Sequence, residues 1–150
     1  MFFKKFQLAL ASVIGTLALT IGCANVSPTP IAMNSVPADA LAYDVTPEGV
    51  AFAALHGERF EEAYMAMVRL PAGLVSPPQV KSANMFGVMI SGAMVHNALN
   101  AGATNDIVLP AGSYYQIPAG VAHVSKCVSE IDCVTFLSQD GKFDFQQVSQ

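Results

Sequence analysis

The 150-residue chain has few basic residues. Lys and Arg number 7 against 11 Asp and Glu, and charged residues make up only 12% of the chain. The few cations form no cluster along the sequence, so binding to nucleic acid or to anionic lipid head groups is not expected. The length is enough for one domain with a hydrophobic core and too short for two.

Long apolar runs are absent after the first 22 residues. Residues 6–21 form such a run, and Lys4 and Lys5 precede it. A positive start followed by an apolar run shorter than a membrane span is typical of a secretory signal. We therefore expect residues 1–22 to be a cleaved signal peptide, with a short transmembrane anchor as the alternative. Cleavage would leave 5 basic and 11 acidic residues, a net charge of −6.

The apolar run ends in TIGC, residues 20–23, which resembles the lipobox of bacterial lipoproteins. This resemblance implies cleavage before Cys23 and lipidation of its thiol, although Thr20 stands where the usual Leu would be. Ordinary secretion is the alternative. In bacterial lipoproteins an aspartate directly after the lipidated cysteine is associated with inner-membrane retention, and position 24 is alanine here. The resemblance therefore implies a lipid anchor on the periplasmic side of the outer membrane. Residues 23–42 contain three prolines and no apolar periodicity, which predicts a flexible tether.

Cysteine is scarce, with three residues in the whole chain. Lipidation accounts for Cys23 and leaves Cys127 and Cys133. An even pair of cysteines in an exported protein predicts a disulfide. A cysteine-based metal site is the alternative, but it would need closer spacing and further ligands.

A sustained helical period is missing beyond the signal. From residue 43 to 150 the chain alternates between short apolar runs and turn residues, which predicts an antiparallel β-sandwich or barrel. The predicted strands are 50–56, 64–70, 85–90, 93–97, 106–109, 113–117, 121–127, 132–138 and 143–148. Within residues 121–127, Lys126 should face solvent, so His123 and Cys127 should point inward.

Residues 112–123, GSYYQIPAGVAH, place a Gly, a Pro, a Gly and a His at the spacing of a known motif. The segment resembles the second conserved motif of the cupin superfamily, and residues 70–92 resemble the frame of the first. The resemblance extends over residues 45–148 and is to a cupin-like group of exported bacterial proteins of uncharacterised function. It implies an all-β fold, a single small cupin-like barrel of the double-stranded β-helix or jelly-roll kind. One departure is Cys127, which stands where the superfamily often has Asn.

The first motif lacks the metal ligands that the cupin resemblance would supply. Gln79 and Lys81 occupy the usual histidine positions, and Met85 falls at or near the glutamate position. A lysine cation would oppose a divalent ion by roughly 4 kcal/mol at 4 Å and partial burial. We therefore predict no cofactor. If a divalent metal does bind, as the alternative has it, His123 and His96 are the available imidazoles.

Without the metal ligands, the site would consist of a few polar side chains at one end of an otherwise apolar cavity. Lys81, Gln79 and His123 could hold a small anion or carboxylate there. The candidate pocket residues are Gln79, Lys81, Met85, Tyr114, Tyr115 and His123, with one of the two tyrosines facing inward. Two other interpretations stay open: His123 is simply a buried, hydrogen-bonded residue, or Lys81 extends to solvent.

Three functions remain after these exclusions. The first is a non-enzymatic exported domain that binds a small molecule. The second is a metal-dependent cupin enzyme, such as a dioxygenase, with an atypical ligand set that includes His123. The third is a structural lipoprotein that pairs with a second copy of itself as a homodimer.

Overall fold

The computed structural model describes residues 32–99 and 106–148. The predicted signal peptide, Cys23 and the first part of the predicted tether lie outside these residues. Within the described part of the tether, Ala38–Ala40 form a short 3-10 helix, η1, with no buried residue. No helix in the described ranges is long and apolar enough to cross a membrane.

The domain is built almost entirely of antiparallel strands. Their bounds are β1 Asp44–Val45, β2 Ala51–His56, β3 Tyr64–Leu70, β4 Gln79–Val80, β5 Met85–Ser91, β6 Ala93–Ala98, β7 Leu109–Pro110, β8 Tyr114–Ile117, β9 His123–Cys127, β10 Cys133–Gln139 and β11 Gln146–Gln147. They form a six-stranded sheet in the order β1-β2-β3-β10-β5-β8 and a five-stranded sheet in the order β11-β4-β9-β6-β7. We call these the large sheet and the small sheet. The all-β prediction is confirmed.

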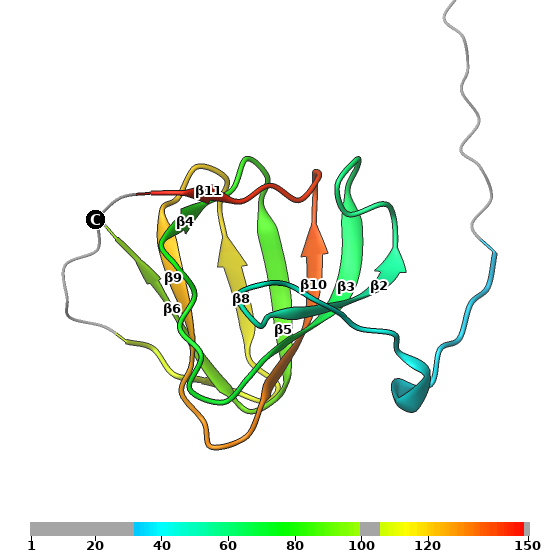
Figure 1. Cartoon of the computed structure of the whole chain (residues 1–150), viewed down its shortest axis with the longest axis horizontal. Coiled ribbons are helices and arrows are strands. Elements are labelled where there is room, and N and C mark those ends of the chain that lie inside the picture. Colours follow the sequence, from blue (N-terminus) through cyan, green and yellow to red (C-terminus); the bar gives the residue numbers. More distant parts are fainter. Residues whose placement is uncertain (1–31, 100–105, 149–150) are drawn as a thin grey trace, which may run out of the picture. The chain divides into compact units, whose positions relative to one another are not determined.

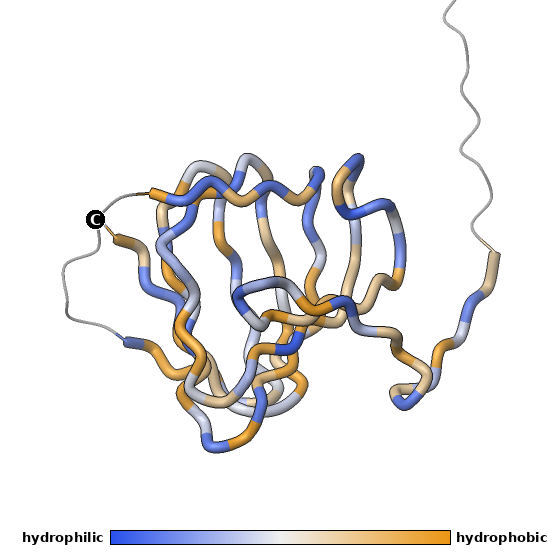
Figure 2. Tube along the Cα trace, in the orientation of Figure 1, coloured by the Kyte–Doolittle hydropathy of each residue, from blue (hydrophilic) through white to orange (hydrophobic). Residues whose placement is uncertain are grey.

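Each predicted strand overlaps an observed one, but two are much shorter than expected. Of residues 106–109 only Leu109 is in a strand, and of residues 143–148 only Gln146 and Gln147 are. The pattern also missed β1 and β4. Strands of two residues cannot show an alternation, which explains why the pattern missed them. Figure 2 shows short hydrophobic stretches along the strands, interrupted by hydrophilic turns.

The core lies between the two sheets and draws side chains from both. Met94 and Cys127 come from the small sheet, and Leu70, Met89 and Leu137 come from the large sheet. Strand β10 is central because it pairs with β3 on one side and β5 on the other. Its odd-numbered residues are buried and its even-numbered residues are half-buried, as one inward and one outward face require.

A disulfide joins Cys127 at the end of β9 to Cys133 at the start of β10. The predicted pairing is therefore present, and it links the small sheet to the large one. Beside it, Gly92 connects β5 of the large sheet to β6 of the small sheet with a φ of +72°. A Cβ at this position would lie 2.9 Å from the carbonyl oxygen of Asp132, so the close crossing requires glycine.

Candidate functional site

A cavity of about 100 Å³ lies inside the barrel. Apolar side chains from the large sheet, among them Phe52, Val68 and Leu137, form much of its wall. Its polar lining includes Gln79, Lys81, His96, Tyr115, Ser125 and Thr135. Mostly apolar cavities with a few placed polar groups are typical ligand sites.

Lys81 follows directly after β4 and is only 5% exposed. Its Nζ donates a hydrogen bond of 2.7 Å to the backbone oxygen of Asp144 and lies 3.7 Å from the centre of the Phe143 ring. The interpretation in which Lys81 extends to solvent is therefore wrong. Burial lowers the pKa of Lys81 to about 8, opposed by the charge of Asp144 and assisted by that of Arg59.

Gln79 lies in β4, directly opposite His123 of β9, and is 8% exposed. Its amide donates a long hydrogen bond of 3.4 Å to the hydroxyl of Ser76, which also accepts a bond from the backbone N–H of Ser125. The serine thus connects the polar side of the cavity to the backbone of β9. Met85, the third residue of the degenerate first motif, lines the cavity from β5.

His96, the second imidazole considered as a metal ligand, belongs to β6 of the small sheet. Strand β6 continues to Ala98, so His96 lies within the sheet and lines the cavity. Its Nδ1 is 2.9 Å from the hydroxyl of Ser125, while its Nε2 is buried without a partner among the described residues. Burial lowers the pKa of His96 to about 4, with a smaller contribution from His123, so the ring is neutral at pH 7.

His123 is 2% exposed and faces inward, but it does not appear among the described residues that line the cavity. Its Nδ1–H donates a hydrogen bond of 2.9 Å to the carbonyl of Val121, so the Nε2 of the neutral ring carries a lone pair. That Nε2 is also buried with no partner within the described ranges. Burial, and secondarily the charge of Lys81, lower the pKa of His123.

Of the two candidate tyrosines, Tyr115 faces inward at 7% exposure and Tyr114 is 59% exposed. The Tyr115 hydroxyl lies 3.1 Å from Thr135 Oγ1, and its ring centre is 4.3 Å from that of His96. Tyr115 is paired with Gly87 of β5, where a Cβ would lie 2.1 Å from the tyrosine ring. Glycine at position 87 therefore lets the ring lie against the sheet backbone.

Sequence reasoning missed an aromatic and cationic cluster at the side of the cavity. The Phe143 ring is 5.5 Å from that of Phe52 and 5.8 Å from that of Phe60, edge to face in each case. The guanidinium carbon of Arg59 lies 4.3 Å from the centre of Phe52 and 4.4 Å from that of Phe60. The available signal was the alternation of FDF at residues 143–145; nothing local identifies Arg59, because it lies in the loop between β2 and β3.

The residues present do not fit a cupin metal centre. Such a centre needs three or four nitrogen or oxygen ligands around one ion. In the part of the chain that the structure describes, no three His, Cys, Asp or Glu side chains form such a group. The buried Lys81 lines the cavity where the motif would place a ligand. The absence of a cofactor nevertheless stays a prediction.

Three solved structures illustrate what the barrel is similar to. The polyketide cyclase RemF from Streptomyces resistomycificus superposes with a TM-score of 0.64 at 13% identity, covering 79% of this chain and 87% of its own. An RmlC-like cupin from Shewanella frigidimarina gives 0.55 at 14%, with coverages of 71% and 91%. The Cnp3 cupin domain of Schizosaccharomyces pombe gives 0.54 at 15%, with coverages of 66% and 69%. Identities this low establish the cupin fold alone.

No curated protein matches the sequence. A family model described as "Domain of unknown function (DUF4437)" matches residues 33–147, which is most of the chain and all of the barrel up to β11. The chain is therefore a cupin-fold protein that belongs to the DUF4437 family.

Proposed function

We propose that this chain is an exported domain that binds a small organic acid in its barrel cavity and catalyses no reaction on it. The observation that carries the proposal is the cavity itself, with an apolar wall on the large sheet and the buried amine of Lys81 beside the small sheet. A desolvated cation in such a cavity favours an anionic ligand group because little water screens the attraction.

The volume of the cavity limits the size of the ligand. A dry apolar cavity of roughly 150 Å³ accepts benzene, so about 100 Å³ suits a short-chain molecule. Its hydrocarbon part would pack against Phe52, Val68 and Leu137, and its carboxylate would approach Lys81 and the amide of Gln79. The neutral ring of His96 would supply one further hydrogen bond through Nε2.

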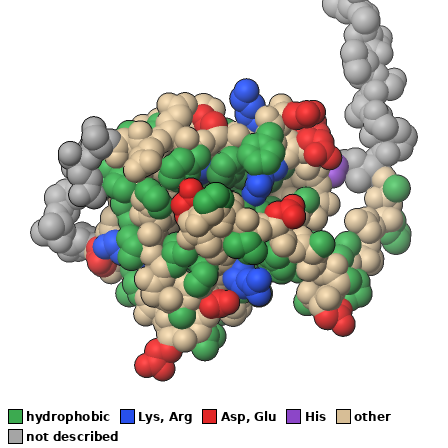
Figure 3. Space-filling view, in the orientation of Figure 1, with side chains coloured by type: hydrophobic (Ala, Val, Ile, Leu, Met, Phe, Trp, Pro, Cys, Tyr) green, Lys and Arg blue, Asp and Glu red, His purple; other side chains and the backbone are tan. Residues whose placement is uncertain are grey.

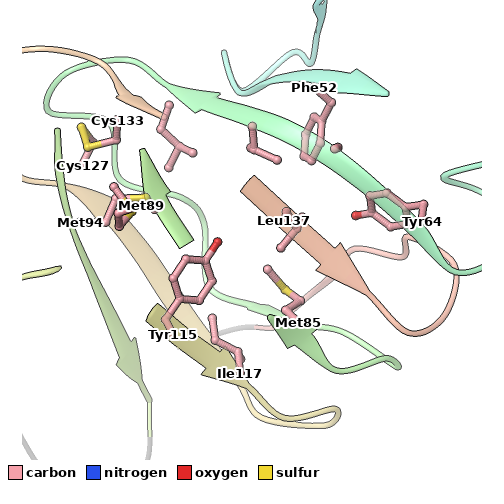
Figure 4. Close-up of a cluster of buried hydrophobic side chains, with 13 residues drawn as sticks. Phe52, Tyr64, Met85, Met89, Met94, Tyr115, Ile117, Cys127, Cys133 and Leu137 are labelled. Atoms are coloured by element: carbon pink, nitrogen blue, oxygen red, sulfur yellow. A yellow bond between two sulfur atoms is a disulfide. The ribbon is translucent and has the colours of Figure 1, made fainter. Parts of the chain in front are cut away.

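Export and anchoring complete the proposal. The charged, apolar and cysteine-terminated order of residues 1–23 supports removal of a signal and lipidation of Cys23. One acyl chain anchors weakly, and several anchor firmly, so a fully lipidated Cys23 would hold the barrel at the periplasmic face of the outer membrane. On the face seen in Figure 3, basic side chains are few and lie apart from one another.

A thermal-shift titration with short-chain carboxylic acids tests acid binding. The melting temperature of the wild-type protein should rise with butanoate concentration and reach a plateau. Lys81→Met should abolish the rise. Lys142→Met is the matched control, because Lys142 is exposed and does not line the cavity. If no acid shifts the wild type, or if both variants respond equally, the proposal is wrong.

One observation favours the metal-dependent enzyme as a second candidate. His96 and His123 each keep a buried Nε2 with no partner within the described residues, while each Nδ1 contacts an oxygen. Metal-binding histidines commonly show this arrangement. Metal analysis of protein purified without chelators separates the candidates. A stoichiometric metal that disappears in His123→Ala would favour the enzyme over the binding domain.

A further inference from the structure

The side chain of Lys81 has features of a nucleophile as well as those of a charge. Lys81 lines the cavity and is nearly closed to solvent, and its amine lies 3.7 Å from the centre of the Phe143 ring and 5.4 Å from that of Phe145. One N–H is held by the Asp144 carbonyl at 2.7 Å. A neutral amine in this position keeps its lone pair, because only one of its hydrogens is needed for that bond.

The surroundings of Lys81 lower its pKa on balance, so a minor neutral fraction of the amine is present at pH 7 beside the cation that would bind an acid. Burial is the largest effect, and the nearby Arg59 adds to it. Arg59 and Lys81 lie 5.2 Å and 3.7 Å from the same Phe143 centre, so the two cationic groups are within about 9 Å of each other. The Asp144 carboxylate opposes the shift but is bound by the backbone N–H of Ser82.

Among the residues that the structure describes, the other titratable groups near Lys81 include no buried carboxylate. His123 senses the charge of Lys81, and its ring is held neutral by burial. Glu48 lines the same cavity but is exposed. A lysine that is desolvated in an apolar pocket beside another cation is the arrangement that activates amines for attack on carbonyl groups.

We infer that Lys81 captures small aldehydes or ketones in the barrel cavity as a reversible imine. The inference rests on the same cavity as the proposed function and adds a covalent ligand class to it. Small acids bind without reaction, and carbonyl compounds bind through the amine. The two kinds of ligand therefore compete for one place.

The chemistry is balanced without any oxidant or reductant. The free amine of Lys81 adds its lone pair to the carbonyl carbon, the carbonyl electron pair moves to oxygen, and a proton passes from nitrogen to that oxygen. The resulting carbinolamine loses water and leaves a carbon–nitrogen double bond. Hydrolysis reverses the sequence and releases the ligand unchanged, so the step is a capture and not a turnover.

Reductive trapping tests the inference on the purified protein. We would treat it with butanal and sodium cyanoborohydride at pH 7, then quantify butylation of Lys81, Lys126 and Lys142 by peptide mass spectrometry. A pKa near 8 gives on the order of a hundredfold more free amine at pH 7 than an ordinary lysine has. Lys81 should therefore be labelled about tenfold or more faster than Lys142. Its rate should rise from pH 6 and level off above pH 8.

Competition and a conservative variant complete the test. Butanoate should slow labelling of Lys81 and leave Lys142 unaffected. Lys81→Arg keeps the positive charge but offers no primary amine, so no butyl group should be found at position 81 while Lys142 is labelled as in the wild type. Labelling of Lys81 that is no faster than that of Lys142, or that butanoate does not slow, would overturn the inference.

The outcomes separate the inference from the proposed function. If butanoate stabilises the wild type and Lys81 is not trapped, the imine fails and acid binding stands. If Lys81 is trapped selectively and no acid stabilises the protein, the imine stands and the acid-binding function fails. If neither is seen, both fail.

Discussion

Buried polar groups on the inner faces of the two sheets differ in whether they have hydrogen-bond partners. On the large sheet the polar side chains satisfy each other: Tyr64 donates to Gln139 at 3.3 Å, and Tyr115 contacts Thr135 at 3.1 Å. On the small sheet, His96 and His123 each leave a buried Nε2 with no partner within the described residues. A buried polar atom without a partner costs about 1–3 kcal/mol.

This difference assigns separate roles to the two sheets. The large sheet contributes most of the apolar core and has little left for a ligand to satisfy. Of these two histidines, His96 lines the cavity, so a ligand there could bond to its Nε2 and return that free energy on binding. Stability should therefore respond most to changes on the large sheet, and ligand binding to changes on the small sheet and at Lys81.

The largest expected effect comes from shortening a core residue of the large sheet. Leu137 is 3% exposed and lines the cavity, so Leu137→Ala should lower the free energy of unfolding by about 2–5 kcal/mol. Urea unfolding followed by circular dichroism measures this loss. Val134→Ala, on the outer face of the same strand, should cost about 1 kcal/mol or less. Equal losses would mean that the inner face is not the principal core.

The second-largest effect should come from lowering the pH, which should destabilise the protein through the histidines of the small sheet. The folded-state pKa of His96 is about 4, below its ordinary value of about 6.5, so the unfolded chain binds more protons between these values. Stability should therefore fall as pH drops from 6.5 to 4, by up to about 3 kcal/mol from His96. The lowered pKa of His123 acts in the same direction.

Urea midpoints between pH 7 and pH 4 measure this acid effect. His96→Gln removes the titrating ring and should flatten much of the dependence. His56→Gln is the control, because His56 is exposed at the end of β2. An unchanged slope in His96→Gln would show that the half-buried imidazole of His96 does not govern the pH dependence of stability.

The disulfide between the sheets should give the smallest of these effects. Cys127 and Cys133 are six positions apart, so opening the link restores the entropy of only a short loop, worth about 2 kcal/mol. The double variant Cys127→Ser with Cys133→Ser should lose about that amount in urea unfolding. A loss as large as that of Leu137→Ala would mean that the connection between the sheets contributes as much as the core.

The long strands and the inward face of β9 could be predicted because their side chains alternate. Lys126 identified the outer face, and His123 and Cys127 are accordingly buried. The environment of His96 could not be predicted, because its place in the sheet depends on how far β6 pairs with β9. The two-residue strands β1 and β4 were missed for the related reason that their pairing partners define them, not their own residues.

The candidate site also contains both residues that the sequence predicted and residues that it did not. Gln79, Lys81 and Met85 were found through their positions in a motif, and all three line the cavity. Phe143 and Arg59 were missed because they come from the last turns of the domain and from a loop, which meet only in the folded barrel. The lowered pKa of Lys81 depends on that meeting and on burial.

By itself the sequence determined the class of fold, the pairing of two cysteines and the identity of the residues at the motif positions, because periodicity and residue identity are local properties. Only the tertiary structure decided which polar atoms are left without partners and which amine is desolvated. Those properties depend on what surrounds each group after the two sheets close on each other. The neighbours of a residue along the sequence do not show which groups will surround it in the folded domain.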